Sequence, residues 1–263
     1  MSKLIISNFN GRLGNNILQL VRCVFCANKK KYDYIVFPKH NFFKTNTIII
    51  HENKNSKNIK PDIKHSFFSL HDFELEDPEP KEMKLIFQNY ILQICNINIE
   101  QETTDAFIMH LRGGDIFRGK GAHPYYVQPP LSYYETIIEN NKSKFLIVSE
   151  DKLNPCVDEL TKNKEIDFQS TTLKNDIETL CSTENLSIGF GTFGFMIYLM
   201  SKKLKTLHIP KYVVKELPKG DWGDVNLVKY NLKDYIKCGE WKNTHQQRQF
   251  LLDYSKKNIE IEK

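Results

Sequence analysis

The feature that most constrains this chain is an apolar run over residues 106–109 that ends in a polar, glycine-containing cluster. The cluster reads His110-Leu111-Arg112-Gly113-Gly114-Asp115. A continuous apolar run is typical of a strand that is buried on both faces, and paired glycines let the backbone turn sharply and approach a ligand closely. Ligands of open α/β sheets bind at the carboxyl ends of the strands. The sequence therefore predicts a binding site at the end of this strand.

Arg112 is the central residue of the predicted site. Its planar guanidinium group matches the paired oxygens of a phosphate or a carboxylate, which predicts an anionic ligand. The same spacing also fits a strand-end pair in which Asp115 holds Arg112 and the two residues only fix a loop. On the residues alone, both interpretations remain open.

A second candidate loop lies near the start of the chain. A strand expected over residues 4–9 leads into Asn10-Gly11-Arg12-Leu13-Gly14-Asn15-Asn16, and apolar residues at helical spacing follow. A strand, a glycine loop and a helix in this order present backbone N–H groups and a helix N-terminus to an anion. Two glycines three residues apart without a third are equally typical of a plain tight turn. Spacing does not separate these two interpretations.

Strands and helices alternate along the chain, which predicts an α/β fold with doubly wound parallel sheets. Besides the two strands above, we expect strands at residues 34–38, 47–50, 145–151, 166–168, 186–190 and 204–209. The last of these closes the predicted series. A boundary near residue 100 predicts an N-terminal α/β domain over 1–100 and a C-terminal α/β domain over 101–263 that includes the tail. Trp222 and Trp241 lie in the polar tail, and we expect them to pack rather than to stack on a sugar.

Composition and charge argue against several classes of protein. The chain has 263 residues and a formal net charge of +5, but its lysines are scattered, so nucleic-acid binding is not expected. No apolar run is long enough to cross a bilayer and no secretory signal is evident, which predicts a cytoplasmic protein. The six cysteines follow no framework spacing, and we expect Cys23 and Cys26 to be buried thiols rather than metal ligands.

Three motifs in this chain resemble those of a known family. Gly11-Arg12-Leu13-Gly14-Asn15, the cluster around Arg112 and the helix opening Gly191-Thr192-Phe193 occur here in the order found in fucosyltransferases. Over about residues 4–210 the pattern is similar to the α-1,2-fucosyltransferase family and its α-1,6- and protein O-fucosyltransferase relatives. The resemblance implies a GT-B-like architecture, in which two Rossmann-type domains with parallel sheets face a cleft. It also implies an inverting transfer of fucose from GDP-fucose to a hydroxyl group of a glycan, of the α-1,2 type.

The resemblance implies that the C-terminal domain, 101–263, binds the nucleotide sugar and that the N-terminal domain, 1–100, lies on the acceptor side. Arg112 matches the family arginine that binds the pyrophosphate, where the charge of the leaving group grows in the transition state. Thr192, between Gly191 and Phe193, matches a helix start that binds the phosphates. His110 matches a residue that lines the nucleotide pocket.

The remaining nucleotide-binding candidates come from two other segments. The first-domain loop that faces the donor across the cleft is matched by Gly11, Arg12, Gly14 and Asn15. Asp176 lies at the spacing where α-1,6-type relatives place a carboxylate that binds guanine, and two acceptor oxygens suit the N–H edge of that base. An ordinary acid at the start of a helix explains Asp176 equally well.

The catalytic base is where the chain departs from the family. A base that takes the proton of the acceptor hydroxyl assists an inverting transfer. Relatives of the α-1,6 type carry a glutamate a little beyond the arginine motif, whereas residues 117–121 of this chain contain no acid. Asp115 is the first candidate for this role and His123 the second. Asp115 could instead hold Arg112 in place, and some members of the superfamily lack a clear base.

Alternatives to fucosyl transfer follow from the same residues. The α-1,2 family has the motif Ser-Thr-Phe-Ser-Trp-Trp where this chain has Gly191-Thr192-Phe193-Gly194. This difference leaves open that the donor is another nucleotide sugar. The uncertain base leaves open a non-catalytic protein that binds GDP-sugars. The chain contains no Asp-x-Asp motif, which in many nucleotide-sugar enzymes holds a divalent ion, so neither a metal nor another cofactor is expected. The sequence does not predict the acceptor or the oligomeric state.

Overall fold

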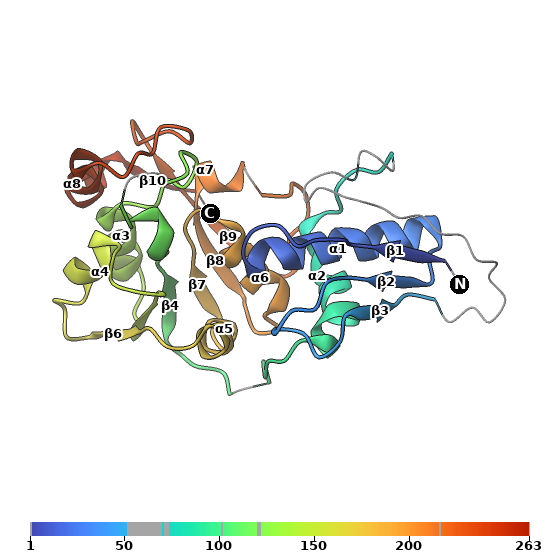
Figure 1. The fold of residues 1–263 in the computed structure, drawn as a ribbon. Helices are drawn as coiled ribbons and strands as arrows, with labels where there is room; N and C mark the ends of the chain where they lie inside the picture. Colours follow the sequence, from blue (N-terminus) through green and yellow to red (C-terminus); the bar gives the residue numbers. More distant parts are fainter. Residues whose placement is uncertain are drawn as a thin grey trace. The chain divides into compact units, whose positions relative to one another are not determined.

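The computed structural model of the chain describes residues 2–51, 70, 74–100, 102–119, 122–215 and 217–262. The chain divides into two compact units, and each has its own sheet. The first unit contains Met1–Asn98, Phe195–Met200 and Pro218–Gly223. The second unit contains Ile99–Gly194, Ser201–Leu217 and Asp224–Lys263. Both units combine helices with strands, which confirms the α/β class (Figure 1).

The first unit has a three-stranded sheet. Its elements from the first part of the chain are β1 (Lys3–Ile5), α1 (Leu13–Lys30), β2 (Tyr34–Val36), β3 (Thr47–Ile49), α2 (Pro80–Ile86), the π-helical turn η2 (Phe87–Ile91) and the 3-10 turn η3 (Leu92–Ile94). Strands β1 and β2 are parallel, whereas β2 and β3 are antiparallel. The expectation of a parallel sheet is therefore wrong at β3. The connection over 37–46 is shorter than the dozen or so residues that a parallel crossover needs.

Helix α1 is the largest element of the first unit and is buried along most of its length. Its apolar side chains include Ile17 and Leu20, neither of which has any exposed surface. The helix ends at Lys31, whose left-handed backbone lets its N–H donate to the carbonyl of Ala27. Cys23 and Cys26 are buried in α1 as expected. Burial, the largest cause, raises the pKa of their thiols to about 12 and about 11, so both remain protonated.

Helix α6 (Thr192–Met200) returns from the second half of the chain, and its residues Phe195–Met200 belong to the first unit. All of these residues are fully buried, because the helix is apolar on every side. The hydroxyl group of Tyr198 donates to the carbonyl of Trp222 at 3.0 Å. The ring of Trp222 lies 4.7 Å from that of Tyr198, so Trp222 packs as the sequence predicts.

The second unit has a seven-stranded sheet. Its strands are β4 (Phe107–His110), β5 (Phe145–Val148), β6 (Ile166–Gln169), β7 (Asn185–Ser187), β8 (Thr206–Pro210), β9 (Asn226–Leu232) and β10 (Ile259–Glu262). Its helices and 3-10 turns are η4 (Gly114–Ile116), α3 (Leu131–Asn140), α4 (Pro155–Leu160), α5 (Leu173–Cys181), α7 (Lys211–Val214), α8 (His245–Asp253) and η5 (Lys256–Asn258). Figure 1 shows these elements in chain order by colour.

The strand order of this sheet is β10-β9-β8-β7-β4-β5-β6. The chain runs from β4 outward through β5 to β6, then returns to the other side of β4 and continues outward through β7, β8 and β9. These six strands are all parallel, and their order is that of a doubly wound nucleotide-binding fold. The order reverses between β4 and β7. In such folds, ligands bind at this reversal, beside the carboxyl ends of the two strands.

The predicted end of the sheet is wrong, because the segment after Pro210, which we call the tail, adds further strands. Strand β8 does not close the series, because β9 and β10 follow it, and β10 is antiparallel to β9. The tail also completes the core of this unit. Trp241 has no exposed surface, its ring centroid lies 5.6 Å from that of Phe117, and its indole N–H donates to the carbonyl of Ile116 at 3.4 Å. The expectation that Trp241 packs is therefore confirmed.

Candidate functional site

The motif around Arg112 and the motif around Thr192 meet at the reversal of strand order in the second unit. Strands β4 and β7 pair directly, with Met109 opposite Ser187. Arg112 follows the carboxyl end of β4, and Gly191 and Thr192 follow the carboxyl end of β7. Two segments that are far apart in the sequence therefore supply one candidate site, at the place where this fold binds ligands.

The side chain of Arg112 is held on two sides. Its guanidinium carbon lies 4.2 Å from the ring centroid of Tyr126, within the range of a cation–π interaction. A Cβ atom at Gly191 would lie 2.6 Å from Nη1 of Arg112, so a larger residue at this position would displace the guanidinium group. The side chain is 15% exposed, and its Nη2 atom is 3.5 Å from Oδ1 of Asp115. At this distance the bond to Asp115 is weak, and the guanidinium group keeps capacity for an anion.

The backbone of the Arg112 motif is fixed by the loop that follows β5. Gly114 has a left-handed backbone (φ 58°), and its N–H donates to both carboxylate oxygens of Asp151 at 3.1 and 3.2 Å. The side-chain amide of Asn154, which is fully buried, donates to the carbonyl of Arg112 at 3.1 Å. Asp151 and Asn154 therefore hold the backbone of the Arg112 motif in position. The sequence places acids after β5, but nothing in their spacing indicates this role.

A second pair of loops is joined beside Arg112. The side-chain amide of Gln128, also fully buried, donates to the carbonyl of Tyr126 at 3.2 Å and to that of Phe190 at 3.4 Å. The ring centroids of Tyr126 and Phe190 lie 5.9 Å apart. These contacts tie the loop before α3 to the loop after β7. Tyr126 and Gln128 are site residues that the sequence analysis missed, because their role depends on which strands are neighbours.

His110 and Phe193 lie together at the same end of the sheet. Their ring centroids are 4.9 Å apart, with an angle of 37° between the ring planes. Burial, and to a smaller extent the positive charge of Arg112, lowers the pKa of His110 to about 4. His110 is therefore neutral near pH 7. A buried histidine elsewhere in the unit, His208, is held neutral in the same way, because burial lowers its pKa to about 4.

We expect these two histidines to make the second unit less stable as the pH falls from about 6.5 towards 4. In this window the unfolded chain binds protons that the folded chain does not, so the free energy of unfolding decreases. The loss is at most about 1.4 kcal/mol per pH unit for each histidine. Urea unfolding at about pH 7, 6 and 5 measures it, and His208→Gln should remove part of the slope. The exposed His245→Gln is the matched control, and an equal slope in wild type and His208→Gln would contradict the prediction.

The two candidates for the catalytic base are both brought near Arg112. Asp115 is 45% exposed and bonds weakly to Arg112, as described above. His123 is exposed, and its ring centroid lies 4.9 Å from that of Tyr126. Tyr126 thus contacts both Arg112 and His123.

Asp176 is engaged by its own loop. It lies in the first turn of α5 and is 7% exposed. Its Oδ1 atom accepts hydrogen bonds from the side-chain amide of Gln169 at 2.9 Å and from the hydroxyl group of Thr171 at 2.6 Å. This is the environment of a carboxylate at a helix start. Strand β6, which precedes it, lies two strands away from β4, so these contacts do not bring Asp176 to Arg112.

The glycine loop of the first unit leads into α1. Gly11 has a left-handed backbone (φ 78°), and a Cβ atom there would lie 2.2 Å from Nδ2 of Asn15. Arg12 is the exposed residue that precedes the first turn of α1, and Gly14 is buried within this turn. The loop therefore has the strand, turn and helix order that the sequence predicts, and Asn10, Gly11 and Arg12 are exposed to solvent.

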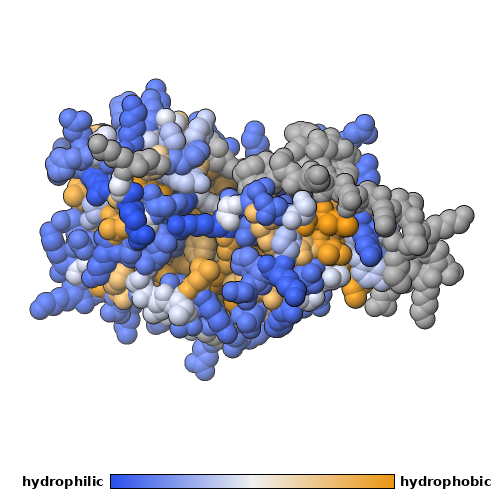
Figure 2. Space-filling model, in the orientation of Figure 1, coloured by the Kyte–Doolittle hydropathy of each residue, from blue (hydrophilic) through white to orange (hydrophobic). Residues whose placement is uncertain are grey.

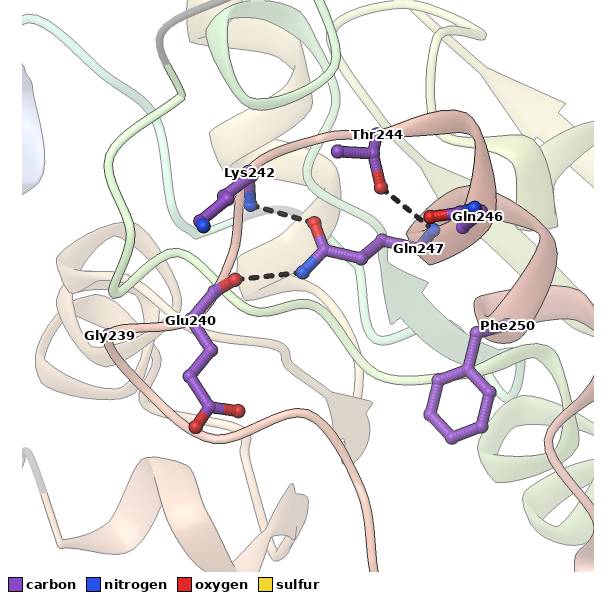
Figure 3. Close-up of a pocket in the computed structure, with 7 residues that line it drawn as sticks. All are labelled: Gly239, Glu240, Lys242, Thr244, Gln246, Gln247 and Phe250. Carbon is purple, nitrogen blue, oxygen red and sulfur yellow. Dashed lines mark hydrogen bonds between the residues drawn. The ribbon is translucent and has the colours of Figure 1, made fainter.

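A separate hollow of about 810 Å³ lies in the tail of the second unit. Figure 3 shows its lining, which is Gly239, Glu240, Lys242, Thr244, Gln246, Gln247 and Phe250. The side chain of Gln247 bonds at 2.7 Å to the backbone N–H of Lys242 and at 2.7 Å to the carbonyl of Glu240. These bonds connect the start of α8 to the preceding loop. None of the site residues predicted from the sequence lines this hollow.

Among the described residues, no group of three or more His, Cys, Asp or Glu side chains could hold a metal ion. In the same part of the chain, no helix combines the length and the apolar character that a membrane span requires. Hydrophilic side chains cover most of the visible face over β6 and α8 (Figure 2).

Comparisons of the chain with protein-family models, with curated proteins and with solved structures found no match. The resemblance to fucosyltransferases therefore rests on the three motifs. Independently of that resemblance, the geometry around Arg112 favours a bound anion.

Proposed function

We propose that this protein is an inverting, metal-independent glycosyltransferase that moves fucose from GDP-fucose to a hydroxyl group of a glycan. The observation that carries the proposal is the meeting of Arg112 with the Gly191-Thr192 helix start at the reversal of strand order. The resemblance supplies the donor, and the geometry supports an anion at this point. A fixed arginine and the N-terminus of a helix both favour a bound diphosphate.

The chemistry of the transfer suits this arrangement. When the bond between the sugar and GDP breaks, negative charge builds up on the diphosphate, and a preorganised cation stabilises that charge most. Tyr126 stacks on the guanidinium group of Arg112 before the donor binds, and Gly191 leaves room for it, so little reorganisation is needed. The acceptor oxygen attacks the anomeric carbon from the opposite side. Its proton passes to a base, for which Asp115 is the first candidate and His123 the second.

The same proposal assigns the two units. The second unit is the donor domain, because it carries Arg112 and the doubly wound sheet. The first unit supplies the acceptor side through the loop Gly11–Asn15, in the GT-B-like arrangement that the resemblance implies. Within the donor domain we assign the binding of guanine to Asp176. Its hydrogen bonds to Gln169 and Thr171 are compatible with this role but do not require it.

Isothermal titration of the protein with GDP, with and without Mg²⁺, tests the proposal. We expect micromolar binding of GDP that is unchanged by Mg²⁺ or by a chelator. UDP and dTDP in the same titration identify a different donor if one of them binds more tightly. Transfer is then measured with GDP-fucose over a panel of glycans, and GDP binding without turnover on any of them would favour a non-catalytic protein. Failure of all three nucleotides to bind would contradict the proposal.

We expect Gly191→Ala to weaken GDP binding by about tenfold or more. The added Cβ atom would lie 2.6 Å from Nη1 of Arg112, so the arginine must move away from its present position. Gly119→Ala is the matched control. Gly119 also has a positive φ, of 71°, but a Cβ atom there meets nothing within 4 Å. The control therefore also adds a Cβ atom at a positive φ, although φ is 130° at Gly191, and it does so without touching Arg112. Equal GDP affinities in the two variants would contradict this prediction.

A further inference from the structure

A short loop beside Arg112 carries three aromatic side chains, His123, Tyr125 and Tyr126, which we call the ring loop. The ring of His123 lies 5.8 Å from that of Tyr125 and 4.9 Å from that of Tyr126. Tyr125 is 47% exposed, which is unusual for so large a side chain, and the core of the second unit does not use it. The ring loop therefore presents aromatic surface to solvent.

The ring loop is held in place by the rest of the unit. The carbonyl of Pro124, between His123 and Tyr125, accepts hydrogen bonds from the backbone N–H groups of Gly239 at 3.0 Å and Trp241 at 3.1 Å. Within the loop, the N–H of Tyr126 donates to the carbonyl of His123 at 2.9 Å. Trp241 is fully buried, so these bonds connect the ring loop to the core. The aromatic surface is thus presented on a fixed backbone.

The ring loop contacts Arg112, the residue that binds the diphosphate in the proposed function. Tyr126 contacts the guanidinium group of Arg112 at 4.2 Å and the ring of His123 at 4.9 Å. A diphosphate bound by Arg112 would therefore place its sugar close to this loop. Arg112 is 15% exposed, whereas His123 and Tyr125 are open to solvent, from which an acceptor arrives.

From this arrangement we infer that the ring loop binds a pyranose ring of the acceptor glycan. The C–H face of a pyranose is apolar and covers an aromatic ring, while the imidazole nitrogen of His123 and the hydroxyl group of Tyr125 can bond to the sugar hydroxyls. The inference rests on the proposed function, because the position of Arg112 defines which side of the loop faces the donor. It gives His123 a contact with the acceptor in addition to its candidacy as a base.

The test uses the full chain with methyl pyranosides of galactose, glucose, mannose and N-acetylglucosamine as probes. Saturation-transfer NMR in the presence of GDP measures the affinity of each probe, and calorimetry measures the affinity for GDP. We expect at least one pyranoside to bind and Tyr125→Ala to weaken it about tenfold, while the affinity for GDP stays unchanged. Tyr125→Phe keeps the ring and should retain most of the binding. Phe250→Ala removes an aromatic side chain that is 38% exposed and lines the hollow of the tail. It should leave the affinities for the pyranoside and for GDP unchanged.

Each outcome decides the inference. Equal pyranoside affinity in wild type and Tyr125→Ala overturns it, as does a loss of binding in Phe250→Ala alone, which would place the sugar in the hollow of the tail. If the protein binds GDP but none of the pyranosides, the ring loop is not a sugar site, whereas the proposed donor site is retained. Pyranoside binding that depends on Tyr125 in a protein that does not bind GDP supports the ring loop and contradicts the proposed donor.

Discussion

Replacing Arg112 with alanine is expected to weaken the binding of GDP about 100-fold, equivalent to nearly 3 kcal/mol of binding free energy. The guanidinium group lies at the reversal of strand order, stacked on Tyr126 and close to Gly191. Its removal takes away the charged group that the proposed function assigns to the diphosphate. Arg112→Lys keeps the charge but loses the planar fork and the stacking on Tyr126, so we expect an intermediate loss of about tenfold.

The matched control for this prediction is Arg118→Ala. Arg118 lies in the same unit, its side chain is 75% exposed, and it pairs with Asp151 at 3.6 Å. We expect its loss to change the affinity for GDP by no more than about twofold, because exposed ion pairs contribute little. Calorimetry gives the affinities, and thermal unfolding shows whether each variant folds. GDP binding by a folded Arg112→Ala protein at the wild-type affinity would refute the site.

Replacing Trp241 with alanine is expected to destabilise the second unit by about 3–5 kcal/mol. The side chain is fully buried, packs edge-on against Phe117, and donates its indole N–H to the carbonyl of Ile116. The substitution leaves a large cavity and an unpaired carbonyl in the interior. Trp241→Phe keeps much of the ring and should cost less.

Urea unfolding of the variants measures this effect. Phe250→Ala is the control from the same tail, because Phe250 is 38% exposed and its truncation removes less buried surface. We expect it to cost about 1 kcal/mol. Equal stability of Trp241→Ala and Phe250→Ala would mean that the tail is not part of the core. If folded Trp241→Ala also binds GDP less tightly, the lost hydrogen bond from Trp241 to Ile116, directly after the Arg112 motif, explains it.

The sequence predicts the position of Arg112 well, for a physical reason. A strand that is buried on both faces must be apolar throughout, so residues 106–109 indicate a central strand, and the polar residues after it mark the ligand end. Alternating strands and helices then predict the α/β class. The same patterns do not show that Gly191 lies against Arg112, because that contact depends on β7 returning to the side of β4.

Other parts of the site and fold are beyond such patterns. Asp151, Asn154 and Gln128 act through hydrogen bonds to the backbone of distant loops, and no spacing in the sequence indicates their partners. The sequence pattern does not predict β9 and β10, although Ile259-Glu260-Ile261-Glu262 alternates as a strand does. Only β10 lies at the edge of the sheet, where most of its residues are exposed, whereas β9 lies between β8 and β10 and mixes polar with apolar residues. The role of Asp176 stays a prediction, since its surroundings suit a plain helix start.

The pairing of β4 with β7 also determines when the site forms during folding. It joins Ile108 to Leu186, the most distant partners in the chain among the paired strands of the seven-stranded sheet. Contacts between distant residues form late, because the entropy of closing the intervening chain must be overcome first. Arg112 and Gly191 come together only when this pairing is complete. We therefore expect a refolding chain to form its local helices and the β5–β6 pair before it forms the anion site, so that ligand binding reports a long-range step of its folding.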